Sequence, residues 1–156
     1  MSDGAEIAKT FYEAFNRRDA KAMNALYAPE ATFSDPGFPG LKGDQTRGMW
    51  DMLCKNAKDF SVEYKVTGAS DTHADVDWTA RYTFSRTGRP VVNLVRTRMT
   101  IQGKKIVDQV DTFDFYGWAK QAFGFTGYVI GWTPFFQKKV QSTARESLDR
   151  HLAKGN

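Results

Sequence analysis

The sequence predicts an α+β fold in which a strongly curved antiparallel sheet packs on a layer of helices. Two observations predict it. Helical periodicity is concentrated in residues 5–57, with one short strand inserted, and period-two alternation then runs through four successive segments of residues 60–114. Strands joined by tight turns form an antiparallel sheet with one buried face, so the preceding helices are expected to cover that face.

Three helices are expected before the sheet, at residues 5–16, 19–27 and 46–57. In the first, Ile7, Phe11 and Phe15 recur at i, i+4 and i+8. Asp19 is a suitable N-cap for the second, and Pro29 is expected to end it. The third carries an apolar face of Met49, Trp50, Leu53, Cys54 and Ala57.

Strands are expected at residues 32–35, 60–67, 76–84, 91–102 and 106–114. The Thr87–Pro90 and Gly103–Lys105 segments have the composition of tight turns between the last three. Beyond the sheet, residues 116–123 predict one or two helical turns, and a final helix is expected from Pro134 to Leu152. We therefore divide the chain into a main domain, residues 1–123, and a C-terminal apolar arm with a basic helix, residues 124–156.

Composition limits the function classes. The 156 residues are long enough for one domain with a real core, and 22 of them are aromatic, which favours an aromatic-lined cavity or interface. The net charge of +4 resides mostly in residues 137–156, and no basic run alternates with aromatic residues, so we expect no nucleic-acid partner. A lone cysteine, Cys54, and the lack of a signal-like N-terminus predict a cytoplasmic protein.

Asp35 is the strongest catalytic candidate. A short strand carries it into a Pro/Gly-rich loop beside Phe33 and Phe38. Apolar surroundings raise the pKa of a carboxylic acid and can make it a usable base near neutral pH. The alternative is a purely structural role, in which the carboxylate accepts hydrogen bonds from loop N–H groups near Gly37.

The segment LYAPEATFSDPGFPGLKG, residues 26–43, together with the helices around it and the four-strand pattern, resembles the nuclear transport factor 2-like superfamily. Within it, the chain resembles the SnoaL-like group, which is related to ketosteroid isomerase and limonene epoxide hydrolase. The resemblance covers about residues 5–123 and implies a cone-shaped, cystatin-like fold. Members include isomerases, hydrolases, cyclases and non-catalytic domains, so the resemblance implies no single reaction.

Carried over residue by residue, the resemblance is partial. Asp35 matches the proton-shuttling acid of the isomerase, but Phe11 stands where its tyrosine is expected, with Tyr12 next to it, and the second acid falls near Thr97. The Asp111-Thr-Phe-Asp114 segment matches a strand end of the epoxide hydrolase. That enzyme's arginine has Arg81 as its nearest charged candidate here.

Asp35 and Asp111 are the predicted catalytic residues. By the resemblance, Gln109, Asp111 and Phe113 face the concave side of the sheet, and two acids there could act as an acid/base pair. The alternative for Asp111 is a solvated or ion-paired residue on the convex face. The expected substrate pocket is formed by Tyr12, Phe15, Phe33, Trp50, Leu53, Trp78, Tyr82, Asn93, Thr97, Met99 and Phe113.

Metal and cofactor sites are not indicated. His73 and His151 lie far apart without acidic or Cys neighbours at ligand spacing, and the glycines match no phosphate or dinucleotide loop. The arm leaves three alternatives open: a lid over the cavity mouth, a segment on an anionic membrane surface with Lys138 and Lys139 at the head groups, or packing on its own domain or across a dimer.

The sequence thus predicts a small enzyme that uses no cofactor and acts by acid/base chemistry on a hydrophobic molecule. A homodimer through the outer face of the sheet is expected. The alternatives are a non-catalytic binding domain for an apolar ligand and a membrane or partner module that uses the arm.

Overall fold

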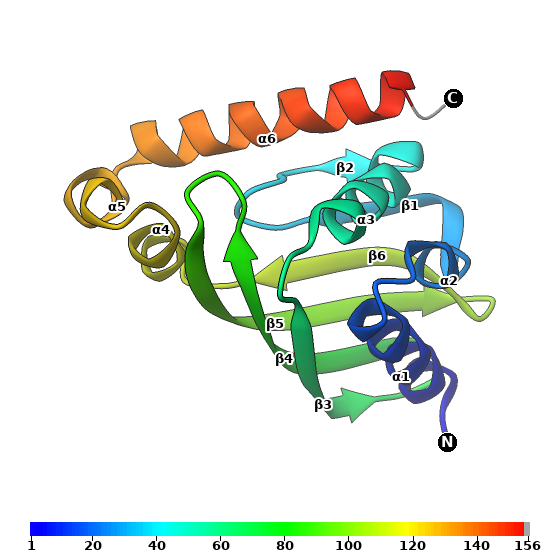
Figure 1. The fold of residues 1–156 in the computed structure, drawn as a ribbon. Coiled ribbons are helices and arrows are strands. Elements are labelled where there is room, and N and C mark those ends of the chain that lie inside the picture. Colours follow the sequence, from blue (N-terminus) through cyan, green and yellow to red (C-terminus); the bar gives the residue numbers. More distant parts are fainter. Residues whose placement is uncertain (155–156) are drawn as a thin grey trace.

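The computed structural model describes residues 1–154 and has the predicted α+β architecture (Figure 1). The strands are β1 (Tyr27–Ser34), β2 (Leu41–Lys42), β3 (Ser61–Ala69), β4 (His73–Phe84), β5 (Arg89–Gln102) and β6 (Lys105–Thr112). The helices are α1 (Asp3–Asn16), α2 (Ala20–Asn24), α3 (Asp44–Asn56), α4 (Phe115–Phe123), α5 (Phe125–Ile130) and α6 (Pro134–Lys154). The strands form one curved sheet in the order β2-β1-β6-β5-β4-β3, and α1 and α3 lie on its concave side.

The β3–β6 meander is antiparallel, as predicted, but β1 adds to β6 in parallel and β2 pairs with β1. The sheet is therefore mixed, and β2 was not predicted. The second helix is also shorter than expected, because it ends at Asn24 and Tyr27 already begins β1. Pro29, expected to end a helix, lies in a strand whose register shifts between Tyr27 and Thr32, and a strand irregularity tolerates the missing N–H.

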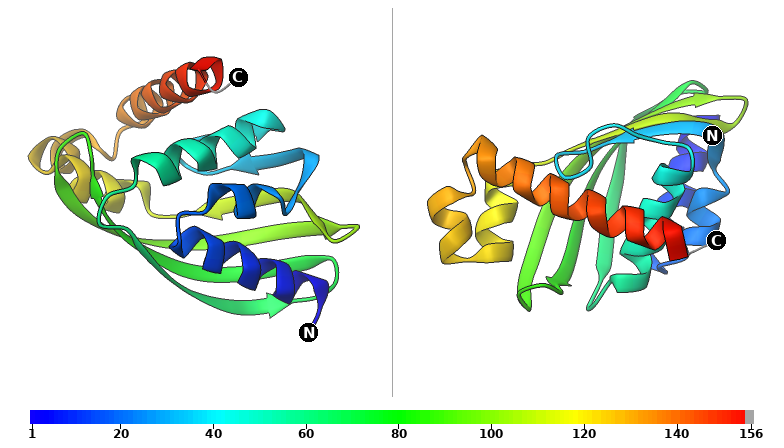
Figure 2. Two further views of the ribbon diagram at one scale, coloured as in Figure 1. Left: turned by 45° about the vertical axis from the view of Figure 1, so that its right-hand side comes forward. Right: turned by 90° about the horizontal axis from the view of Figure 1, so that it is seen from above.

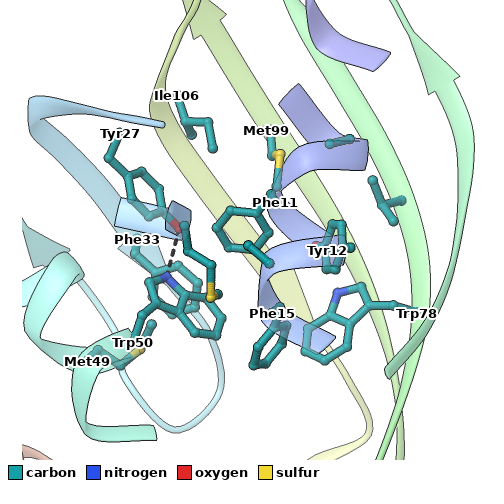
Figure 3. Packing of buried hydrophobic residues seen from close by; sticks show 14 of the residues in the cluster. Phe11, Tyr12, Phe15, Tyr27, Phe33, Met49, Trp50, Trp78, Met99 and Ile106 are labelled. Atoms are coloured by element: carbon teal, nitrogen blue, oxygen red, sulfur yellow. Dashed lines mark hydrogen bonds between the residues drawn. The ribbon is translucent and has the colours of Figure 1, made fainter. Parts of the chain in front are cut away.

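The apolar face of α1 forms the centre of the core. Phe11 is completely buried, and its ring meets the rings of Tyr27 and Trp50 edge to face (Figure 3). Such pairs add to the free energy of burial. The next helix begins as predicted, because the Asp19 carboxylate accepts a hydrogen bond from the Ala22 N–H at 3.1 Å.

The last helix, α6, returns over the domain and packs on α3 (Figures 1 and 2). Leu148 is fully buried at this contact, and Gly48 of α3 leaves the space that the side chain of Leu152 occupies. The arm therefore packs on its own domain. Within residues 1–154, no helix has the length and apolarity needed to cross a bilayer.

Candidate functional site

A cavity of about 600 Å³ lies between the concave sheet face, α3, α4 and α6. This volume is within the usual range for small-molecule sites. Both predicted acids, Asp35 and Asp111, line it. The pocket residues predicted from sequence that also line it are Phe15, Trp50, Leu53, Trp78, Tyr82, Asn93 and Phe113.

Four residues predicted for the pocket lie behind its wall instead. Tyr12, Phe33, Thr97 and Met99 are each at most 1% exposed and do not line the cavity. They share the inward strand or helix face with lining residues, so periodicity alone could not separate the two groups. Their depth in the core is set by α1, which fills the concave side near them.

Asp35 lies directly after β1 at the start of a tight turn. Its Oδ1 accepts hydrogen bonds from the N–H groups of Gly37 at 2.7 Å and Phe38 at 2.6 Å, so the structural role considered for this residue is confirmed. Burial raises the pKa of Asp35 to about 6, although the two N–H groups act to lower it. No hydrogen bond from the described residues reaches Oδ2, which leaves that oxygen available to a ligand.

Asp111 projects from the concave face of β6 and is 3% exposed. Its Oδ1 accepts hydrogen bonds from the Thr97 hydroxyl at 2.6 Å and from Gln109 Nε2 at 3.3 Å. Burial raises the pKa of Asp111 to about 7, and the charge of Asp35 acts in the same direction, while the two hydrogen bonds oppose them. Its Oδ2 also receives no hydrogen bond from residues 1–154.

Two chains of hydrogen bonds converge on Asp111. Trp78 Nε1 donates to the Thr97 hydroxyl at 2.7 Å, which in turn donates to Asp111. The second chain begins where Trp50 Nε1 donates to the Tyr27 hydroxyl at 2.8 Å, as Figure 3 shows. That hydroxyl donates to Gln109 Oε1 at 2.6 Å, which orients the amide so that its NH₂ group faces the carboxylate.

Tyr27 was not among the predicted site residues. Gln109 offers a sequence signal, because it lies two residues before Asp111 and therefore on the same strand face. Tyr27 offered none, because it was assigned to the end of a helix. Tyr27 holds the Gln109 amide in a fixed orientation, and Gln109 donates a hydrogen bond to the Asp111 carboxylate. These contacts limit rotation of the Asp111 side chain.

Two residues matched to the epoxide hydrolase lie elsewhere. Arg81 is exposed and its Nη1 is 2.7 Å from Glu63 Oε1. Asp114 follows the last strand and caps α4, accepting a hydrogen bond from the Gly117 N–H at 3.1 Å. The arginines that do line the cavity, Arg86 and Arg150, are exposed and therefore belong to its mouth.

Helices α4 and α6 supply cavity walls that were not among the predicted pocket residues, although a lid formed by the arm was one of the alternatives left open. Trp118 of α4 lines the cavity, and its Nε1 donates to the Tyr82 hydroxyl at 2.8 Å. From α6, the lining residues are Val140, Thr143, Ala144, Ser147 and Arg150. The spacing of Phe136, Val140, Ala144 and Leu148 is a helical stripe that could have indicated an inward face.

Metal ligation finds no support in the described part of the chain, where no group of three or more His, Cys, Asp or Glu residues is placed to hold an ion. The site offers instead two carboxylates, hydroxyl and amide groups, and an aromatic wall. Such a set can bind an apolar molecule, orient one polar atom of it and move a proton.

Solved structures similar to this chain share its fold. A hypothetical protein of ketosteroid isomerase-like fold from Catenulispora acidiphila, in complex with trimethylamine, is 18% identical with a TM-score of 0.66, over 84% of this chain and 99% of that one. An LEH-like epoxide hydrolase of M. tuberculosis is 17% identical with a TM-score of 0.62, over 83% and 96%. IdmH of Streptomyces antibioticus, proposed to be a polyketide cyclase, is 21% identical with a TM-score of 0.63, over 75% and 96%.

Sequence comparison gives the family. None of the curated proteins compared with the chain matches its sequence. The family model of the SnoaL-like domain, however, matches residues 8–109, which include the helical layer, the Asp35 turn and most of the sheet. The chain therefore belongs to the SnoaL-like domain family, with the nuclear transport factor 2-like fold that the sequence predicted.

Proposed function

We propose that this protein is a small enzyme that needs no cofactor and performs acid/base chemistry on a hydrophobic small molecule held in the cavity. The observation that carries the proposal is the pair Asp35 and Asp111. Both carboxylates line one largely aromatic cavity, and each has a raised pKa and one oxygen without a hydrogen bond from the described residues. Paired acids with different environments are typical of acid/base sites.

The two acids would have different roles. Since its pKa is about 6, Asp35 is mostly ionised near neutral pH and can accept a proton from the substrate or from a bound water. The pKa of Asp111 is about 7 and rises with the negative charge of Asp35. Asp111 is therefore protonated in a substantial fraction of molecules at neutral pH, and in that form it can donate its proton to a substrate oxygen as negative charge develops there.

The comparisons support this reaction class without choosing within it. The similar structures include an epoxide hydrolase and proteins proposed to be a cyclase or an isomerase, all at low identity. One fold carries many reactions, so the isomerase-, cyclase- or hydrolase-like character must be found by experiment. Screening would use steroid enones, terpene epoxides and linear polyketide-like thioesters.

The decisive variants are Asp35→Asn and Asp35→Ala. Asparagine retains an oxygen that can accept from Gly37 and Phe38, so Asp35→Asn should preserve the turn while lowering kcat about a hundredfold or more. Asp35→Ala should also lower stability, because it leaves two N–H groups unpaired. Asp59→Asn, at an exposed acid, is the matched control. Full turnover by Asp35→Asn on an identified substrate would refute the role of this residue.

A non-catalytic ligand-binding domain is the second candidate, favoured by the structural use of Asp35 in its turn. It predicts tight binding of an apolar compound, detected by native mass spectrometry, with no chemical change on long incubation.

The expected homodimer is a separate prediction. Leu94 is 69% exposed on the outer sheet face, so Leu94→Glu should convert a dimer to a monomer in sedimentation velocity.

A further inference from the structure

One end of the molecule carries an unusual concentration of exposed apolar side chains. They belong to α5, to the residues that join it to α6 and to the first turn of α6, at one end of the ribbon in Figure 1. We call this group the apolar tip; it comprises Phe125 (83% exposed), Tyr128 (64%), Val129 (49%), Ile130 (38%), Trp132 (66%) and Phe135 (73%). Contiguous exposure of this kind marks an interaction surface.

The charge around the apolar tip has a single sign. From Phe115 to Arg145 the chain contains Lys120, Lys138, Lys139 and Arg145 and no Asp or Glu. Arg89, the first residue of β5, lies beside it, because its guanidinium packs against Gly124 and its Nε donates to the Gln121 carbonyl at 2.7 Å. Acids flank this stretch on both sides: Asp114 caps α4, Glu146 follows Arg145, and Arg145 pairs with Asp149 at 3.6 Å.

The backbone holds these side chains outward. Gly127 packs so closely on α4 that a Cβ there would lie 2.0 Å from the Ala119 carbonyl oxygen. The Tyr116 hydroxyl donates to the Tyr128 carbonyl at 2.8 Å, and Trp132 Nε1 donates to the Val129 carbonyl at 2.9 Å. The exposed apolar tip is thus carried by a defined backbone, so binding requires little reordering of the main chain.

We propose that the apolar tip docks on the surface of an anionic lipid membrane. Aromatic and aliphatic side chains would enter the boundary between head groups and acyl chains, while Lys138, Lys139 and Lys120 would meet the anionic head groups. Trp and Tyr favour that depth because they combine an apolar ring with a polar group.

Charge argues against a second copy as the occupant. A two-fold interface through the apolar tip would bring the same surface of both copies together, and with it Lys138 and Lys139 of each copy, for which the described residues provide no ion pair. Single-stranded nucleic acid would fit the cations and rings, but it offers little to Val129 and Ile130. An anionic membrane satisfies the aliphatic residues, the aromatic residues and the cations together.

Docking would also bring the cover of the cavity close to the bilayer. Helix α6 begins at the apolar tip with Pro134 and Phe135, and its later turns line the cavity with Val140 and Ala144. The proposal does not depend on the chemistry of Asp35 and Asp111, since docking and turnover are measured separately.

The test is partition of the full chain onto vesicles of phosphatidylcholine alone and of phosphatidylcholine with one-third phosphatidylglycerol. We expect co-sedimentation with the anionic vesicles, weakened by salt, and a blue shift of the tryptophan emission on binding that is reduced by Trp132→Phe, since the chain also contains Trp50, Trp78 and Trp118. Phe125→Ser/Phe135→Ser should weaken partition about tenfold or more, because burial of each ring contributes favourably. Lys138→Gln/Lys139→Gln should weaken binding to anionic vesicles alone.

Matched controls are Lys9→Gln/Lys21→Gln, at exposed cations of α1 and α2, and Lys55→Gln/Lys58→Gln, at exposed cations at and just after the end of α3. Both should leave partition within about threefold of wild type. The proposal is overturned if the wild-type chain stays free of anionic vesicles at low salt, or if the control variants weaken binding as much as the tip variants. Self-association or oligo(dT) binding that depends on the tip, without vesicle binding, would likewise overturn it.

Discussion

Thr97 and Asp111 face each other across β5 and β6, and the Thr97 hydroxyl donates a hydrogen bond to the Asp111 carboxylate over 2.6 Å. The same hydroxyl accepts from Trp78 Nε1, and it donates its single proton to Asp111. A cavity residue, Trp78, thereby fixes the orientation of a group that holds the candidate acid. The Thr97 side chain therefore links Trp78, in the cavity wall, to the hydrogen bonding of the Asp111 carboxylate.

Thr97→Val should test this link, because it removes the hydroxyl with little change of volume. The variant leaves the Asp111 carboxylate with one donor fewer and Trp78 Nε1 unpaired. We expect a loss of about 2 kcal/mol in the free energy of unfolding, and a larger loss near pH 8, where Asp111 is charged, than near pH 5. Thr97→Ser, which keeps the hydroxyl, should lose less; equal losses at both pH values would contradict the link.

Asp111→Asn should make the protein relatively more stable as the pH rises. The pKa of Asp111 is raised from 3.8 to about 7 in the fold, so the native state binds a proton more tightly than the unfolded state does. The stability that this proton supplies is complete below about pH 4 and is lost as the pH rises through about 7. One pKa unit is worth about 1.4 kcal/mol, so the effect amounts to several kcal/mol.

The measurement is the difference in the free energy of unfolding between variant and wild type, by urea titration at several pH values. Asparagine keeps an oxygen for the Thr97 and Gln109 donors, so the difference reports the charge. We expect the free energy of unfolding of Asp111→Asn to increase relative to that of the wild type between about pH 5 and pH 8. Asp77→Asn, at a surface ion pair with Arg96, is the control. A difference independent of pH would contradict a raised pKa.

The sequence could predict the meander and the concave face because alternation in a strand determines which side chains face inward. Asn93 and Thr97 on β5 were assigned to the pocket face; Asn93 lines the cavity, and Thr97 lies on the same face but deeper in the core. The parallel β1–β6 pair was beyond such reasoning. Long-range pairing depends on where β1 is carried by the helices, and no local pattern of β1 records its partner.

The candidate site was predictable to the extent that it depends on strand ends and strand faces. Asp35 lies at a strand end and Asp111 on the inner face of a strand, and both line the cavity. Two features were not predictable. The depth of Tyr12 and Met99 depends on how closely α1 approaches the sheet, and the contribution of α6 depends on where a helix more than 100 residues from Asp35 returns. Gln141 Nε2 donates to the Pro36 carbonyl at 2.9 Å and so ties that helix to the Asp35 turn.

Ala144→Trp should fill the cavity from α6. Ala144 lines the cavity and is only partly buried, so an indole there can enter the open volume. We expect binding of an apolar fluorescent probe such as anilinonaphthalene sulfonate to fall about tenfold, since the probe would lose its place. Ala153→Trp, at an exposed position near the end of the same helix, should leave probe binding unchanged. Equal effects of the two variants would show that the probe binds elsewhere.

Gly48→Leu should separate α6 from the rest of the domain. A Cβ at Gly48 would lie 2.5 Å from Leu152 Cδ2 and 3.5 Å from Leu148 Cδ1, so a leucine requires the facing helix to move. Leucine favours a helix more than glycine does, and α3 itself should therefore remain folded. We expect amide exchange in residues 137–150 to accelerate about tenfold or more while β4 and β5 stay protected. Lys55→Leu, at an exposed position of α3, is the control. Because α6 forms one wall of the cavity, Gly48→Leu should also speed the release of a bound apolar probe. If amide exchange and probe release are both unchanged, the contact between Gly48 and Leu152 does not hold α6 in place.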